Sequence, residues 1–274
     1  MNVIESFLKG KISQEQCEDG LYIGENFISV VDGVTSQSEF YGGAKGGKIV
    51  KDLIIEALPQ VDYNATMEEA MSFLNKRIET FYKEKGFYEQ LKNNTEQKIS
   101  ACIIIYSKAR NQLWFLGDSQ VLIDDKYYCF EAVGSDYFSN LRSYLITAEI
   151  LSGRKTEAEL LEHDTIREAI YPLMTKEKIF QNNENAGKYS SSVLNGFKFV
   201  KKDLHCVNVP KLAKQIVIAS DGYPFLEPTL KESEAKLSAL LEEDPLLYKK
   251  FKSTKGIKKG NCSFDDRTYV RFTL

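Results

Sequence analysis

Runs of β-branched and aromatic residues mark the strands that this sequence predicts. The first two runs, 21–23 and 27–31, are separated by three residues that suit a tight turn, so they predict a β-hairpin. Similar runs with turn residues between them fill 99–130, which is typical of an antiparallel meander. Further strands are expected at 193–194, 197–200, 204–209, 215–219 and 267–272.

Apolar residues with helical spacing occupy much of the remaining chain. They recur three and four apart over 49–58, and again over 67–81 after the capping triplet 64–66. Helical spacing also covers most of 137–182, and the last helices are expected at 231–241 and 245–251. Because strand runs are mixed with helix pairs, without strict βαβα alternation, we expect an α+β fold with antiparallel sheets covered by helices. No linker or repeat divides the chain, so one domain is expected over residues 1–274.

The composition changes this picture little. With 274 residues, 43% of them hydrophobic, the chain can bury a full core. A net charge of −3 and dispersed lysines favour neither nucleic acid nor a membrane surface as a partner. No apolar run is long enough to span a bilayer and no signal peptide is visible, so a cytoplasmic location is expected. We also expect a monomer. The five scattered cysteines and two histidines disfavour a zinc site and predict reduced thiols.

Acidic residues stand at the ends of several predicted strands. Asp32, Asp118 and Asp221 each follow a strand, and Asp265 stands just before the last one. An Asp-Gly or Asp-Asp pair taken singly marks an ordinary turn. Several ionised carboxylates brought together, however, are costly to desolvate unless a cation compensates them or some are protonated. The repeated placement beside strands therefore favours a metal site.

Five short motifs contain these residues in order: Glu18-Asp19, Asp32-Gly33, Gly117-Asp118-Ser119, Ser220-Asp221-Gly222 and Asp265-Asp266-Arg267-Thr268. The ordered set resembles the metal-dependent protein phosphatases of type 2C in their bacterial form, from about residue 13 to the C-terminus. Each motif is weak alone, and their order makes the signal specific. The resemblance implies a four-layer αββα sandwich, in which two antiparallel β-sheets are flanked by helices.

The resemblance also implies a dinuclear centre. Asp32 would bridge two Mn²⁺ or Mg²⁺ ions, and the carbonyl of Gly33 would bind one of them. Asp221 and Asp265 would bind the other ion. Such ions prefer oxygen ligands, which agrees with the lack of His or Cys in these motifs.

Four further acidic residues receive supporting roles from the same resemblance. Asp19 would hold a metal-bound water, and Asp118 would bind a third, weaker ion. Glu18 and Asp266 would lie behind the ligands.

The activity implied is hydrolysis of a phosphomonoester by a protein serine/threonine phosphatase. Asp32, Asp221 and Asp265 would act through the metal-bound water, which attacks phosphorus in line. The substrate would be a phosphoprotein. Two alternatives remain open: a pseudophosphatase that serves as a binding or regulatory module, and a phosphatase of a small phosphorylated metabolite.

The chain departs from the family pattern at the substrate phosphate. Many members carry an Arg four residues before the first acidic pair, where this chain has Gln14. Gln120 also replaces the usual Arg after the third motif, and Asp266 stands where Asn is usual. The chain thus resembles a divergent member of the family. Lysines near the acidic loops are candidates to replace the missing Arg, or they serve only as a solvated surface: Lys45, Lys48, Lys255, Lys258 and Lys259.

Overall fold

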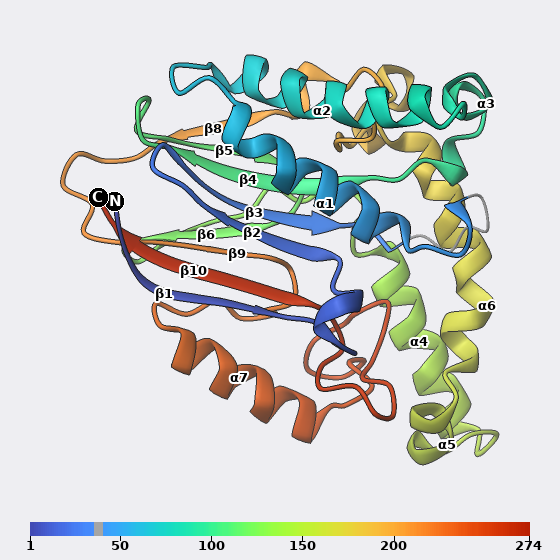
Figure 1. The fold of residues 1–274 in the computed structure, drawn as a ribbon. Helices are drawn as coiled ribbons and strands as arrows, with labels where there is room; N and C mark the ends of the chain where they lie inside the picture. The colour runs from blue at the N-terminus through green and yellow to red at the C-terminus, as the bar shows by residue number, and fades with distance from the viewer. Residues whose placement is uncertain (36–40) are drawn as a thin grey trace.

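Two five-stranded sheets form the centre of the computed structural model, which describes residues 1–35 and 41–274 (Figure 1). The first sheet contains, in spatial order, β1 (Asn2–Lys9), β10 (Arg267–Thr273), β9 (Ile216–Ala219), β6 (Gln120–Ile123) and β7 (Lys126–Tyr128). The second contains β2 (Asp19–Ile23), β3 (Phe27–Gly33), β4 (Ala101–Ser107), β5 (Gln112–Leu116) and β8 (His205–Asn208). Neighbouring strands pair antiparallel in both sheets.

The two sheets pack face to face through an apolar layer. Side chains alternate between the faces of a strand, so each strand contributes every second residue to this layer. Ile104 of β4 points into it, whereas its neighbours Ile103 and Ile105 point to the outer face. Because both faces of the second sheet are covered, every residue of β4 is buried. The residues that meet between the sheets include Ile28, Val30, Phe115, Ile218, Val270 and Phe272.

Helices cover the outer face of each sheet. Helices α1 (Gly46–Ala57) and α2 (Met67–Glu84) pack on the second sheet, and α7 (Leu230–Glu243) packs on the first. A capping box between Thr66 and Glu69 begins α2. The layer order is therefore helix, sheet, sheet, helix, which confirms the predicted αββα sandwich.

A third group of helices stands across one end of the sandwich, at the right of Figure 1. It consists of α4 (Tyr137–Leu151), α5 (Glu157–Glu162) and α6 (Thr165–Met174), and it confirms the helical character predicted for this stretch. The short α3 (Tyr88–Lys92) follows α2. In the part of the chain that the structure describes, no helix combines the length and apolarity needed to cross a bilayer.

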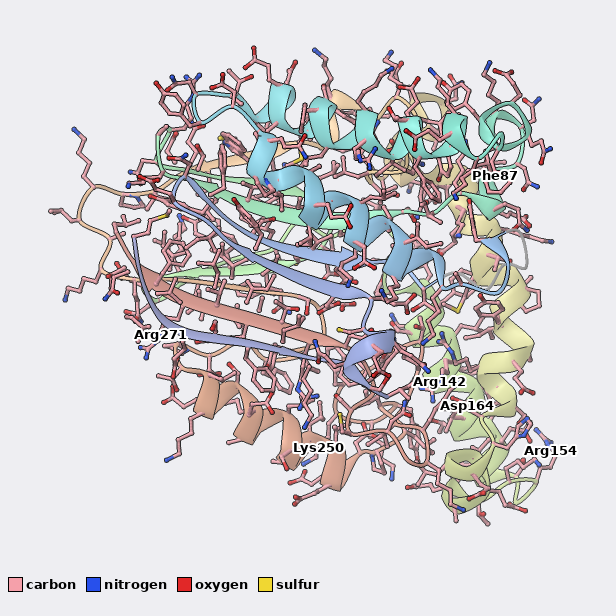
Figure 2. All side chains as sticks on the ribbon, viewed as in Figure 1. Phe87, Arg142, Arg154, Asp164, Lys250 and Arg271 are labelled. Atoms are coloured by element: carbon pink, nitrogen blue, oxygen red, sulfur yellow. The ribbon has the colours of Figure 1, made fainter. Side chains whose placement is uncertain are left out.

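A buried ion pair holds this end group in place. Arg142 of α4 has no exposed side-chain surface, and its Nε and Nη2 donate to Oδ2 of Asp164 at 3.0 and 2.6 Å. Its Nη1 donates to the carbonyls of Leu246 and Ser253 at 2.7 and 3.1 Å. Figure 2 shows Arg142 and Asp164 next to each other. One side chain thus joins α4, the start of α6 and the segment 246–253.

Three local predictions were wrong, and one strand was missed. Residues 193–194 form no strand, and Leu194 makes an isolated β-bridge to Ala101. Residues 245–251 are not helical, because the buried Asp244 carboxylate accepts the backbone N–H groups of Lys249 and Lys250, both at 2.8 Å, and Leu247 has a φ of 51°. Residues 197–200 form no strand, because the side chain of Asn75 in α2 binds the backbone there, including the Phe197 carbonyl at 2.7 Å. The first strand, β1, was not predicted at all.

Replacing Arg142 by Met should lower the free energy of unfolding by about 3–5 kcal/mol. The substitution fills a similar volume but leaves the Asp164 carboxylate and two carbonyls without their donor. Arg154, an exposed residue in the same helical group that pairs with Glu149, is the matched control, and Arg154→Met should cost less than about 1 kcal/mol. Urea denaturation measures both, and equal losses would contradict the importance of the buried pair.

Candidate functional site

The acidic motifs meet at one end of the sandwich, where strands of both sheets begin or end. In the second sheet, β2 begins at Asp19 and β3 ends beside Asp32, and these two residues are direct cross-strand partners. Directly opposed residues of an antiparallel pair point to the same face, so the two carboxylates share one face. In the first sheet, Asp221 follows the end of β9, and Asp265 precedes β10. The antiparallel order thus brings motifs that are far apart in sequence to one edge.

A cavity of about 360 Å³ collects most of these residues. Six of the eight predicted site residues line it: Asp32, Gly33, Asp118, Asp221, Asp265 and Asp266. A larger cavity of about 790 Å³ lies beside it, reaches α5 and α6, and includes Glu18 in its wall. The two cavities share Lys11, Thr35, Arg167, Tyr171 and Lys255. Asp19 lines neither and is buried behind them.

Asp19 links the two sheets. Its Oδ2 accepts hydrogen bonds from Ser220 Oγ at 2.6 Å and from Thr268 Oγ1 at 2.9 Å, and both donors belong to the first sheet's side of the site. Burial raises the pKa of Asp19 to about 8, and repulsion from Asp265 and Asp221 adds to the shift although Ser220 opposes it. The buried carboxyl therefore depends on its two hydroxyl donors.

Asp32 and Asp221 are held where ionisation is unfavourable. Burial raises the pKa of Asp32 well above its usual range, and repulsion from Asp221 and Asp19 adds to it. Asp221 is an exposed residue that lines the cavity. Desolvation by the surrounding protein, then repulsion from Asp265 and Asp118, raises its pKa, whereas Lys255 and a hydrogen bond with Asp32 oppose the shift. A cation between these oxygens would relieve the repulsion.

Asp118 enters the cavity through a turn that requires glycine. Gly117 has a φ of 101°, and a Cβ atom there would lie 2.2 Å from Sγ of Cys102. The Asp118 carbonyl accepts a hydrogen bond from Cys129 Sγ at 3.1 Å. The Gly-Asp pair of the third motif is therefore a matter of backbone geometry as well as of charge.

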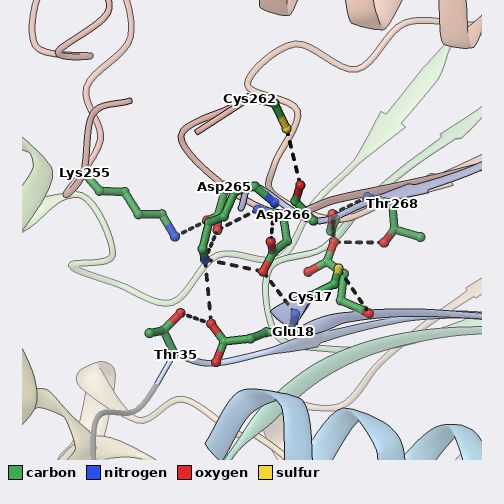
Figure 3. A network of polar contacts seen from close by, with 12 residues as sticks. Cys17, Glu18, Thr35, Lys255, Cys262, Asp265, Asp266 and Thr268 are labelled. Atoms are coloured by element: carbon green, nitrogen blue, oxygen red, sulfur yellow. Dashed lines mark hydrogen bonds and ion pairs between the residues drawn. The ribbon is translucent and has the colours of Figure 1, made fainter. Parts of the chain in front are cut away.

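Asp265 lines the same cavity as the other carboxylates and is paired with two lysines. Lys11 Nζ lies 2.9 Å from its Oδ1, and Lys255 forms an ion pair with its Oδ2 (Figure 3). Burial alone would raise the pKa of Asp265, but Lys255 and Lys11 outweigh it and lower the pKa to about 2. In residues 1–35 and 41–274, no three acidic, His or Cys side chains converge closely enough to chelate one ion. The carboxylates therefore share a cavity, and Asp265 forms ion pairs with Lys11 and Lys255.

Glu18 and Asp266 form the wall behind Asp265. Asp266 accepts the backbone N–H groups of Lys11 at 2.7 Å and of Glu18 at 3.1 Å. Glu18 Oε2 accepts from Thr35 Oγ1 at 2.6 Å, whereas its buried Oε1 has no hydrogen-bond partner among the described residues. Such an oxygen is one that a cation or a water would satisfy.

Gly33 lies where the first acidic loop meets helix α1. A Cβ atom on Gly33 would come within 2.2 Å of the Gly47 carbonyl oxygen, and one on Gly47 within 2.5 Å of Glu18 Oε1. Glycine is thus required at both positions for the loop and the helix to touch. The predicted glycine of the second motif has a packing reason that is independent of metal binding.

Gln14 stands where the resemblance leads us to expect an arginine. Gln14 lies on an exposed 3₁₀ turn, where its side chain accepts from the Gly10 N–H at 3.4 Å, and it lines neither cavity. Three basic residues that line the smaller cavity were missed: Lys11, which precedes all the motifs, Arg167 of α6, and Lys178 of the 3₁₀ helix that follows α6. Of the five candidate lysines, Lys255 reaches the carboxylates, whereas Lys48 pairs with Asp52.

Comparison with known proteins gives a fold. No protein-family model matches the sequence, and no curated protein matches it. The serine/threonine phosphatase Stp1 from Staphylococcus aureus superposes with a TM-score of 0.50 at 12% identity, covering 98% of this chain and 94% of that one. A bacterial serine phosphatase gives 0.50 at 12%, covering 98% and 96%. The catalytic domain of the phosphatase PstP, solved in complex with two manganese ions, gives 0.47 at 14%, covering 98% and 97%. The chain has the fold of bacterial PPM-type serine/threonine phosphatases.

Replacing Ser220 by Ala should lower the free energy of unfolding by about 1–3 kcal/mol. The change removes one of the two hydroxyl donors of the buried Asp19 carboxyl and the acceptor of the Thr268 N–H. Ser238→Ala on the exposed face of α7 is the control and should change stability by less than about 0.5 kcal/mol. Thermal or urea denaturation measures the difference, and a neutral Ser220→Ala would show that Asp19 needs only Thr268.

Proposed function

We propose that residues 1–274 form a single divalent-metal-dependent phosphatase domain that acts on phosphoserine or phosphothreonine. The observation that carries this proposal is the acidic cavity at the end of the sandwich. It gathers Asp32, Asp118, Asp221 and Asp265 from four separate strand ends, in a fold shared with bacterial phosphatases. Burial and mutual repulsion raise the pKa values of Asp32 and Asp221, and a cation bound between them would offset that cost.

The donors of the cavity fit a hard divalent ion. Asp32, Asp221 and the Gly33 carbonyl offer only oxygen, which suits Mn²⁺ or Mg²⁺, and Asp118 would hold a third, weaker ion. Asp265 would join them when Lys11 and Lys255 move from its carboxylate. When bound, the ions would acidify a water and neutralise phosphate oxygens.

The chain's own residues would prepare the site for the ions and the substrate. Asp19, held by two hydroxyls, would orient a metal-bound water from its buried position behind the cavity. Lys11 and Lys255 keep Asp265 ionised, so it remains ready as a ligand. The larger adjoining cavity of about 790 Å³ offers room for the residues that flank a phosphorylated side chain, which favours a phosphoprotein over a small metabolite.

The central test is hydrolysis of an aryl phosphate with Mn²⁺, with Mg²⁺ and with chelator. We expect turnover only with metal, and a loss of at least about a hundredfold in Asp221→Asn, because an amide neutralises a ligand without changing its shape. Asp125→Asn, an exposed acidic residue in the turn before β7, is the matched control and should keep full activity. Full Mn²⁺-dependent activity in Asp221→Asn would refute this assignment.

Metal binding should also be visible without turnover. At Mn²⁺ concentrations near a hundred times Kd, the native state gains about 2.7 kcal/mol, which for a chain of this size raises Tm by roughly 5–10 °C. Asp32→Asn should lose this response. In metal-free buffer its Tm should be no lower than that of the wild type, because the repulsion from Asp221 and Asp19 is removed. Scanning calorimetry with and without Mn²⁺ measures both Tm values. A Mn²⁺-induced rise in Tm that is as large in Asp32→Asn as in the wild type would indicate that the metal binds elsewhere.

A pseudophosphatase is the second candidate function. The observation that favours it is the pairing of Asp265 with Lys11 and Lys255, which supplies positive charge where a metal ligand is expected. Mn²⁺-dependent stabilisation without any hydrolysis would support this candidate. Metal-dependent turnover would refute it.

A further inference from the structure

A substrate phosphate in this acidic cavity needs a positively charged partner. Gln14 is uncharged and lines neither cavity, so it does not provide one. Four cationic side chains line the smaller cavity: Lys11, Arg167, Lys178 and Lys255. Lys11 and Lys255 are engaged with Asp265, and Lys178 donates to the carbonyls of Glu96 and Lys98 at 3.0 and 3.3 Å. Neither Arg167 nor Lys178 has a carboxylate of the described residues within ion-pair distance, but of these two only Arg167 lines both cavities.

Arg167 is held in place without using most of its donors. Its Nη1 donates to the carbonyl of Thr254, the residue before Lys255. The guanidinium group has five N–H donors in a rigid fork, so Nε and Nη2 remain for another partner. Arg167 also lines the larger cavity, so it stands where the two cavities join.

The backbone of Arg167 is fixed by the buried ion pair of the helical group. Asp164 begins α6 and accepts the Arg167 N–H at 2.9 Å, and Arg142 holds the same carboxylate. Burial lowers the pKa of Arg167 and Arg142 lowers it further, whereas Asp164 and Asp265 oppose this, which places the guanidinium in the field of the acidic site. The side chain is thus oriented before any substrate arrives.

We propose that Arg167 binds the phosphate group of the substrate, as the residue that takes the place of the arginine absent at Gln14. This inference rests on the proposed function. An arginine can bind two phosphate oxygens side by side, and it offsets the repulsion that a phosphate dianion meets from the carboxylates of the cavity. Because α6 delivers the guanidinium, phosphate binding in this chain depends on the helical group across the end of the sandwich.

The test is titration of the Mg²⁺-saturated protein with inorganic phosphate in a calorimeter, alongside Mn²⁺ titration and aryl phosphate kinetics. Arg167→Ala should weaken phosphate binding about ten- to a hundredfold, which is the worth of one or two hydrogen bonds to a charged group. Arg167→Lys keeps the charge but loses the forked guanidinium group, so its phosphate affinity should lie between those of the wild type and Arg167→Ala. KM should rise with the phosphate dissociation constant, whereas the Mn²⁺ affinity should stay unchanged.

Arg154→Ala is the control, because Arg154 belongs to the same helical group but is exposed and paired with Glu149. It should bind phosphate as the wild type does. Phosphate binding by Arg167→Ala within twofold of the wild type would overturn the inference, and so would an equal loss of Mn²⁺ affinity, which would indicate a structural role.

The same experiment separates this inference from the proposed function. Phosphate binding that depends on Arg167, in a protein without hydrolysis, would support the anion site and refute the phosphatase. Hydrolysis with an unchanged KM in Arg167→Ala would refute only the role of Arg167. Absence of both binding and hydrolysis in the wild type would refute both.

Discussion

Repulsion between carboxylates is the constraint around which this end of the molecule is organised. Asp19, Asp32 and Asp221 all have raised pKa values because burial or crowding combines with like charges nearby. The protein offsets this cost in two ways: with hydroxyl donors at Asp19 and with lysines at Asp265. Asp32 and Asp221, which line the cavity, have no Lys or Arg within ion-pair distance among the described residues. Two lysines of the protein therefore supply positive charge to Asp265, and a bound cation would supply it to Asp32 and Asp221.

Much of the fold could be predicted because its signals are local. The hairpin before Asp32 and the meander after Ala101 appear in the sequence as short apolar runs with turn residues between them. The acidic residues were recognisable because each stands at a strand end, and the antiparallel order then brings those ends together. Their placement in one cavity depends on the order in which the strands pair, and the spacing of apolar residues alone does not predict that order.

The residues that were missed depend on distant partners. Strand β1 was not recognised, because its pairing partner β10 lies at the other end of the chain. Lys11 is paired with Asp265, and Arg167 lies in the first turn of α6, where Asp164 accepts its backbone N–H and is itself held by Arg142. The segment 245–251 has a helical composition, but the buried Asp244 carboxylate captures its backbone N–H groups. In each case a tertiary contact overrides or creates what the local sequence indicates.

The pairing of β1 with β10 has a practical consequence. Asn2 lies opposite Thr273, so the two chain ends are side by side, and β10 runs from the acidic cavity toward them (Figure 1). The ends are therefore at the far end of the sandwich from the cavity. A surface tether, a fluorescent label or a host protein joined at one or both ends would leave the cavity facing solution, and a new connection between the ends would need only a short loop.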